Sequence, residues 1–175
     1  MPAARCGRCL RKAPLRVSTL APFQYRAPVD ALILAFKRGG DLANGRLLAH
    51  LLAEAARSVV QPQALVPVPL HISRVRERGF DQAKLLARDL ARELALPVIS
   101  GLRRVRATPH QFAFDKAGRK RNVRGAFAAE PELAGYAHIA LVDDVATTGS
   151  TLEACALAAL RAGVQRVDAW VVARA

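Results

Sequence analysis

The stretch Ile139-Ala-Leu-Val-Asp-Asp-Val-Ala-Thr-Thr-Gly-Ser-Thr151 decides the fold of this chain. It begins with four apolar residues, which are typical of a buried strand, and continues with two carboxylates and a turn of small hydroxyl residues. The helix expected next begins with a capping box, in which Ser150 and Glu153 satisfy free amide groups reciprocally. It ends at Gly163, and a second apolar strand spans 167–172. Strand, helix and strand in this order predict an α/β protein with a parallel sheet covered by helices.

The rest of the chain reads as supporting elements around this unit. Residues 29–60 have helical spacing, interrupted at Gly39-Gly40, and 65–70 read as a short buried strand. A further helix is expected from an N-cap at Asp81 to just before Pro97. Residues 98–128 show little periodicity and many basic side chains, so no regular element is predicted there.

Composition bounds the class of protein. A chain of 175 residues, 52% of them hydrophobic, fits one domain over 29–175 preceded by an irregular N-terminal element over 1–28. The net charge of +13 favours a polyanionic partner, although the arginine-rich composition of a GC-rich genome gives the same balance. Three cysteines argue against a disulfide framework. With no secretion signal or membrane-length apolar run in the sequence, we expect a cytoplasmic protein.

The residues after the first strand suit a sugar phosphate. A helix N-terminus behind a turn of hydroxyl residues offers amides, hydroxyls and a favourable dipole to a phosphate. Asp143 and Asp144 would repel that phosphate, but they suit sugar hydroxyls or a divalent metal beside it. No lysine follows Gly149, so this is not a Walker loop. The alternative is a capped helix after a strand, with both acids as solvated turn residues.

Residues 139–151 resemble the signature of type I phosphoribosyltransferases, which bind phosphoribosyl pyrophosphate (PRPP). More narrowly, the chain resembles the ComF family of phosphoribosyltransferase-like proteins linked to DNA uptake and use. The segments that carry this resemblance are Cys6-Gly-Arg-Cys9, Pro22-Phe-Gln-Tyr25, the run to Lys37, Val66-Pro-Val-Pro-Leu70, Arg78-Gly-Phe-Asp-Gln82 and Arg121-Asn-Val-Arg-Gly-Ala-Phe127. The resemblance implies a Rossmann-like type I phosphoribosyltransferase fold.

Carried over to this chain, the resemblance implies that the catalytic candidates Asp143 and Asp144 hold the ribose hydroxyls of PRPP. Where the family has asparagine, Asp81 keeps a helix cap and adds negative charge. The pyrophosphate is expected with Mg²⁺ at the turn after 66–69. The residues expected to bind PRPP are Val145, Ala146, Thr147, Thr148, Gly149, Ser150, Thr151, Leu70 and His71. The implied function is release of pyrophosphate from PRPP in nucleotide or DNA metabolism; the alternative is a non-catalytic single-stranded nucleic-acid-binding protein that keeps the pocket.

A basic segment over 100–125 carries Phe112, Phe114 and His110 among its charges. Arginine interleaved with aromatics is typical of a groove for single-stranded nucleic acid. An active-site lid whose charges meet pyrophosphate, or a solvated loop, fits the same composition. The basic candidates are Arg103, Arg104, Arg106, Lys116, Arg119, Lys120, Arg121 and Arg124.

Cys6 and Cys9 form one CxxC pair, which is half of a four-ligand zinc site. Similar ComF proteins carry further cysteine pairs upstream, so we interpret the N-terminal element as the remnant of a zinc finger, with zinc a cofactor for which half of the ligands are missing. Mg²⁺ with PRPP is the expected cofactor. The expected partners are PRPP, single-stranded DNA and other DNA-uptake proteins, without membrane insertion.

Overall fold

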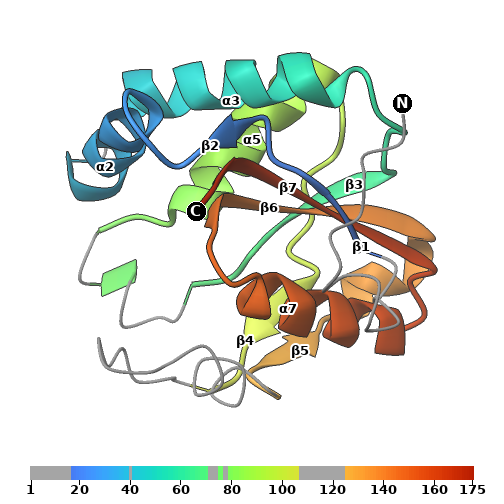
Figure 1. The fold of residues 1–175 in the computed structure, drawn as a ribbon. Coiled ribbons are helices and arrows are strands. Elements are labelled where there is room, and N and C mark those ends of the chain that lie inside the picture. The colour runs from blue at the N-terminus through green and yellow to red at the C-terminus, as the bar shows by residue number, and fades with distance from the viewer. Residues whose placement is uncertain (1–16, 40, 71–74, 77–78, 107–124) are drawn as a thin grey trace.

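Five parallel strands form the central sheet in the described part of the chain, in the order β1-β7-β6-β3, with β2 also beside β7 (Figure 1). The structure, a computed structural model, describes residues 17–39, 41–70, 75–76, 79–106 and 125–175. The elements are β1 (Val17–Leu20), β2 (Phe23–Gln24), α2 (Val29–Gly39), α3 (Leu42–Ala56), β3 (Ala64–Pro67), α5 (Gln82–Leu94), β4 (Leu102–Arg104), β5 (Phe127–Ala129), the 3-10 helix η1 (Pro131–Gly135), β6 (His138–Ala146), α7 (Ser150–Arg161) and β7 (Arg166–Arg174).

Helices cover both faces of the sheet (Figure 1). Because side chains alternate along a strand, Ile139 and Leu141 of β6 pack on the α7 side, whereas Ala140 and Val142 pack on the side of α2, α3 and α5. Trp170, at the centre of β7, lies in this second core and is 1% exposed. The predicted fold class, a parallel α/β sheet flanked by helices, is confirmed.

The edge strand beside β7 comes from the start of the described chain. β1 pairs with Val167–Trp170, and β2 pairs with Ala173–Arg174. Residues 17–24, which the sequence analysis assigned to the N-terminal element, therefore add to the main sheet. The boundary at residue 28 stays a prediction, and residues 1–16 lie outside the described part.

The helices over the second core follow the expected pattern. α2 ends at Gly39, and α3 begins after Asp41, whose side chain accepts hydrogen bonds from the backbone of Ala43 and Asn44. The two helices approach closely where the Phe36 ring lies on Gly45, since a Cβ at position 45 would come within 2.7 Å of that ring. No helix in the described residues is long and apolar enough to span a membrane.

An antiparallel ribbon on the α7 side was not predicted. β4 and β5 pair from Leu102 opposite Ala129 to Arg104 opposite Phe127. Each strand has three residues, too few to show a period of two. Residues 107–124, which connect the two strands, lie outside the described residues.

Candidate functional site

The candidate site lies where β6 ends and α7 begins. The sequence analysis ended this strand at Val142, but β6 continues to Ala146. It stays in register with β7 throughout, with Asp143 opposite Val171 and Ala146 opposite Arg174. The two acids therefore belong to the strand rather than to the turn, because main-chain pairing with β7 outweighs their low preference for strands.

Gly149 makes the turn into α7. Its φ of 75° is left-handed, a conformation open to glycine and strained for residues with a Cβ. The predicted capping box is wrong in its first member, because Gly149 occupies the N-cap without a side-chain hydrogen bond and Ser150 is already helical. The Ser150 hydroxyl is instead 3.0 Å from the Thr148 hydroxyl. The Ser150 amide donates to the same Thr148 hydroxyl at 3.4 Å, so the amides of Thr151 and Leu152 are the ones that the first turn of α7 offers to a ligand.

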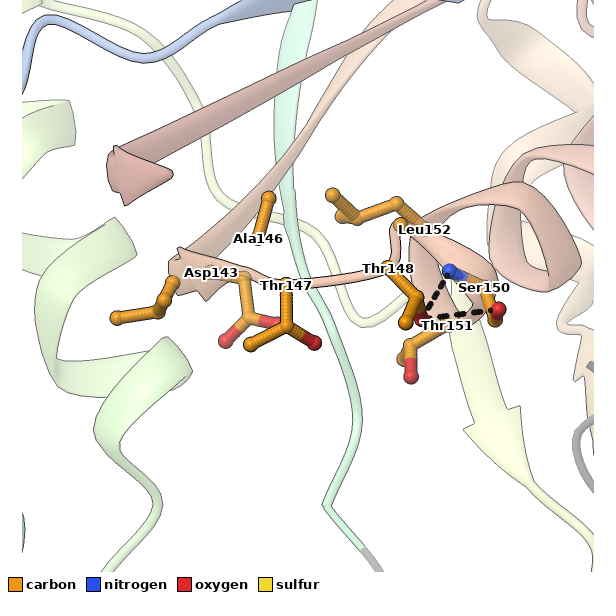
Figure 2. Close-up of a pocket in the computed structure, with 9 residues that line it drawn as sticks. Asp143, Ala146, Thr147, Thr148, Ser150, Thr151 and Leu152 are labelled. Carbon is orange, nitrogen blue, oxygen red and sulfur yellow. Dashed lines mark hydrogen bonds between the residues drawn. The ribbon is translucent and has the colours of Figure 1, made fainter. Parts of the chain in front are cut away.

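A hollow of about 50 Å³ opens at this turn (Figure 2). A water needs roughly 10–15 Å³ of such space, so the hollow accepts a group of phosphate size. Figure 2 shows the Asp143 carboxylate and the Thr147 and Thr151 hydroxyls pointing to the same side of the turn. The lining residues are Asp143, Val145, Ala146, Thr147, Thr148, Gly149, Ser150, Thr151 and Leu152.

Asp143 is a perturbed acid at the edge of this hollow. Burial, and next the negative charge of Asp144, raise its pKa from the ordinary 3.8 to about 8. A hydrogen bond from the Asp144 amide, 2.9 Å from Asp143 Oδ1, and the charge of Lys37 act in the opposite direction. Asp143 therefore carries a proton for much of the time at neutral pH, and it can donate or accept a hydrogen bond.

Asp144 lies on the other face of the strand. It is 7% exposed, does not line the hollow, and places Oδ2 3.0 Å from the Nζ of Lys37, in the last turn of α2. The structure thus brings Asp143 and the loop 145–151 together and separates Asp144 from them. Sequence reasoning missed Lys37 as a partner, since nothing in the sequence relates α2 to a strand more than 100 residues away.

A third acid stands near the pair. Asp81 caps α5 as predicted and accepts a hydrogen bond from the Lys84 amide at 3.2 Å. Desolvation raises the pKa of Asp81, while hydrogen bonds from backbone groups, Leu70 among them, lower it. The negative charge of Asp81 in turn contributes to the raised pKa of Asp143. The Asp81 carboxylate therefore ties the segment after β3 to the start of α5. The other residue expected there, His71, lies outside the described residues.

Two of the basic candidates that the structure describes already contact other side chains of the protein. Arg103 Nε lies 2.6 Å from the carboxylate of Glu130, and the Arg104 guanidinium stacks over Phe127 at 5.4 Å. Arg106 is exposed just beyond β4. The remaining candidates, which are Lys116, Arg119, Lys120, Arg121 and Arg124, lie outside the described residues.

The described residues bring no three His, Cys, Asp or Glu side chains together to hold a metal ion. Mg²⁺ usually keeps several waters and takes one or two carboxylates plus the phosphates of a substrate. The Asp143 carboxylate beside the hollow fits an ion that arrives with a polyphosphate. Cys155 is a buried thiol on α7, and Cys6 and Cys9 lie outside the described residues, so the zinc expectation stays a prediction.

No protein-family model matches the chain. Competence protein F of Haemophilus influenzae is 35% identical over 182 residues, covering 99% of this chain and 80% of that protein. DNA utilization protein YhgH of Escherichia coli K12 is 37% identical, covering 97% of this chain and 77% of that protein. Competence protein ComFC of Bacillus subtilis is 35% identical, covering 83% and 53%. The solved glutamine PRPP amidotransferase from B. subtilis, complexed with ADP and GMP, has a TM-score of 0.47 at 21% identity, covering 71% of this chain and 25% of that one.

Proposed function

The chain belongs to the ComF family, and on that premise we propose that it binds PRPP with Mg²⁺ and acts as a phosphoribosyltransferase-like protein in DNA uptake or utilisation. The biological setting comes from the relatives, which are named competence and DNA utilization proteins. The chemistry comes from the turn between β6 and α7. One observation supports it most: a phosphate-sized hollow lies between the amides of a helix N-terminus and a carboxylate.

The hollow suits the 5-phosphate of the ligand. Thr147, Thr148 and Thr151 offer hydroxyls, and the amides that begin α7 offer donors aligned with the helix dipole. Asp143 stands beside this seat, where its carboxyl group can hydrogen-bond to a ribose hydroxyl. Asp144 would reach a second hydroxyl from the other face of β6.

Bound Mg²⁺ would supply positive charge to the departing pyrophosphate. The chain's own residues would hold the sugar: the phosphate on α7 and the hydroxyls on the two acids keep C1 of the ribose in place. The bond from C1 to the pyrophosphate oxygen would break, the acceptor would bond to C1, and the acceptor's proton would pass to water or to the departing pyrophosphate. The negative charge beside the ribose favours the positive charge that develops on it.

Calorimetric titration of PRPP with Mg²⁺ tests this proposal. The wild type should bind, and the double variant Asp143→Asn/Asp144→Asn should lose at least about tenfold in affinity, because the charge-assisted hydrogen bond from the sugar to Asp144 is lost together with the carboxyl group of Asp143. Glu54→Gln, an exposed carboxylate on α3, is the matched control and should bind like the wild type. Equal affinity of the wild type and the double variant would remove the site.

A second candidate, binding of single-stranded DNA without catalysis, is favoured by the net charge of +13 and by Arg106 at the end of the β4–β5 ribbon. Oligonucleotide binding measured against salt concentration tests it, because several phosphate contacts give a steep slope on logarithmic axes. The charge-reversal variant Arg106→Glu should weaken binding and flatten the slope, with Arg161→Glu on α7 as the control. Turnover of PRPP to pyrophosphate with a panel of bases and amines would favour the enzyme.

A further inference from the structure

One cation reaches the acid pair from a helix distant in the sequence. Lys37 Nζ is 3.0 Å from Asp144 Oδ2, and the Asp144 side chain is 10% exposed while that of Lys37 is 26% exposed. A carboxylate so far from water costs free energy unless a charged partner pairs with it, and such a pair also fixes where the carboxylate lies. Asp144 Oδ2 has Lys37 as its ion-pair partner among the described residues.

The position of Lys37 is fixed by its neighbours. Phe36, the preceding residue, is 1% exposed, lies against Gly45 of α3, and has the Phe80 ring at 6.2 Å. The last turn of a helix also favours a cation, because the helix dipole is negative there. The Lys37 backbone is therefore anchored, and the ammonium reaches Asp144 from a rigid base.

The charges around the pair show what Lys37 does there. Asp143 lies next to Asp144 on β6, and the carboxylate of Asp81, at the start of α5, adds negative charge near this pair. PRPP would bring further negative charge to these acids. A lysine that already holds one of them offsets this repulsion and keeps its carboxylate ready for a sugar hydroxyl.

We propose that Lys37 is a positioning residue of the PRPP site, which holds the Asp144 carboxylate in the orientation in which it can accept a hydrogen bond from the ribose. This inference rests on the proposed function and deepens it. Asp144 Oδ2 would be shared between the Lys37 ammonium and the sugar hydroxyl, because a carboxylate oxygen accepts from two donors at once. Lys37 acts through Asp144 and need not touch the ligand.

The test is a double-mutant cycle read by calorimetric titration of PRPP with Mg²⁺. Lys37→Met should weaken binding by at least about tenfold, since it leaves Asp144 buried without its partner. Lys37→Arg should keep more of the affinity than Lys37→Met, because the guanidinium keeps the positive charge although its planar fork differs in shape from the ammonium. In the Asp144→Asn background, Lys37→Met should have no further effect on affinity. Lys37→Ala should also bind PRPP more weakly than the wild type, and added ethylammonium should restore part of its affinity.

Each outcome decides the matter. Binding by Lys37→Met equal to the wild type would overturn the inference while leaving the proposed function standing. The same loss in the Asp144→Asn background would also overturn it, because Lys37 would then act independently of Asp144. A wild type that fails to bind PRPP would overturn the proposed function itself. Circular dichroism of each variant shows whether it is folded. If Lys37→Met is not folded, Lys37→Gln, which removes the charge but keeps a polar side chain, carries the test with the same expected loss of affinity.

Discussion

Replacing Asp143 by asparagine should make the ligand-free protein more stable at neutral pH while removing a group that the proposed site needs. Asparagine has the same shape, and its carbonyl oxygen can accept the amide of Asp144 as Asp143 Oδ1 does at 2.9 Å. What changes is the charge. Burial and the neighbouring Asp144 disfavour that charge and raise the pKa of Asp143 to about 8.

The size of the effect follows from the shift. Below about pH 4 Asp143 is protonated in the folded and unfolded chains, so it costs nothing. As the pH rises from there to about 8, the unfolded chain releases the proton first, and folding stability is lost. At pH 7 the solution is about three pH units above the ordinary pKa of 3.8, and each unit destabilises the fold by about 1.4 kcal/mol. The Asp143 charge can therefore cost at most about 4 kcal/mol of folding stability at this pH. Partial exposure screens the charge, so we expect about 1–3 kcal/mol.

The assay is urea unfolding followed by the fluorescence of Trp170, the single tryptophan, which is 1% exposed. Measured at several pH values between about 4 and 8, the free energy of unfolding of Asp143→Asn minus that of the wild type should rise with pH. Glu54→Gln, whose parent side chain is 57% exposed and pairs with Arg57, should give a difference that does not rise with pH, because a paired carboxylate stabilises the fold once it is ionised. A difference for Asp143→Asn that does not rise with pH, or a variant less stable than the wild type at pH 8, would refute the reasoning.

Three further predictions concern single residues of the site and its surroundings. Gly149→Val should lower the free energy of unfolding by about 1–2 kcal/mol, because a φ of 75° is strained for a branched side chain even though a Cβ at this position meets nothing within 4 Å. Urea unfolding measures the change, and an unchanged free energy of unfolding would contradict the assigned turn. In the same assay, Asp81→Ala should lower the free energy of unfolding by about 1 kcal/mol because α5 loses its N-cap, whereas Asp81→Asn, which can still cap the helix, should lower it much less. Equal losses in the two variants would show that the cap contributes nothing. In a chain with Cys6 and Cys9 replaced by serine, Cys155 should not react with a thiol reagent until the protein is unfolded, because burial raises the pKa of the thiol and keeps the reagent away from it. Rapid reaction of the native protein would contradict this placement.

The sequence was sufficient for the parts of the fold that repeat a pattern. The β6–α7–β7 unit and the helices α2, α3 and α5 are confirmed, because each buries a face whose apolar residues recur at a regular spacing. The three-residue strands of the β4–β5 ribbon could not be recognised, since they become strands only by pairing with each other. The same reason explains why β6 runs past its acids to Ala146.

The sequence was enough to predict which loop forms the candidate site, but not how the acidic side chains around that loop lie relative to one another. The order of residues placed Asp143 and the loop 145–151 around one turn. It could not show that Asp143 and Asp144 separate to opposite faces of a strand, because that follows from the extension of β6. Nor could it pair Asp144 with Lys37, a contact that depends on how α2 packs on α3.

The contact of Phe36 with Gly45 has a consequence for how this pocket can evolve. Position 45 tolerates no side-chain carbon while the ring stays where it is, since a Cβ would lie only 2.7 Å from it. An alanine there would displace the Phe36 ring, and any part of that displacement that reaches the α2 backbone would move Lys37, the next residue, relative to the carboxylate with which it pairs. A hydrogen atom exchanged for a methyl group on a neighbouring helix can thus retune ligand affinity with every residue in the pocket left unchanged.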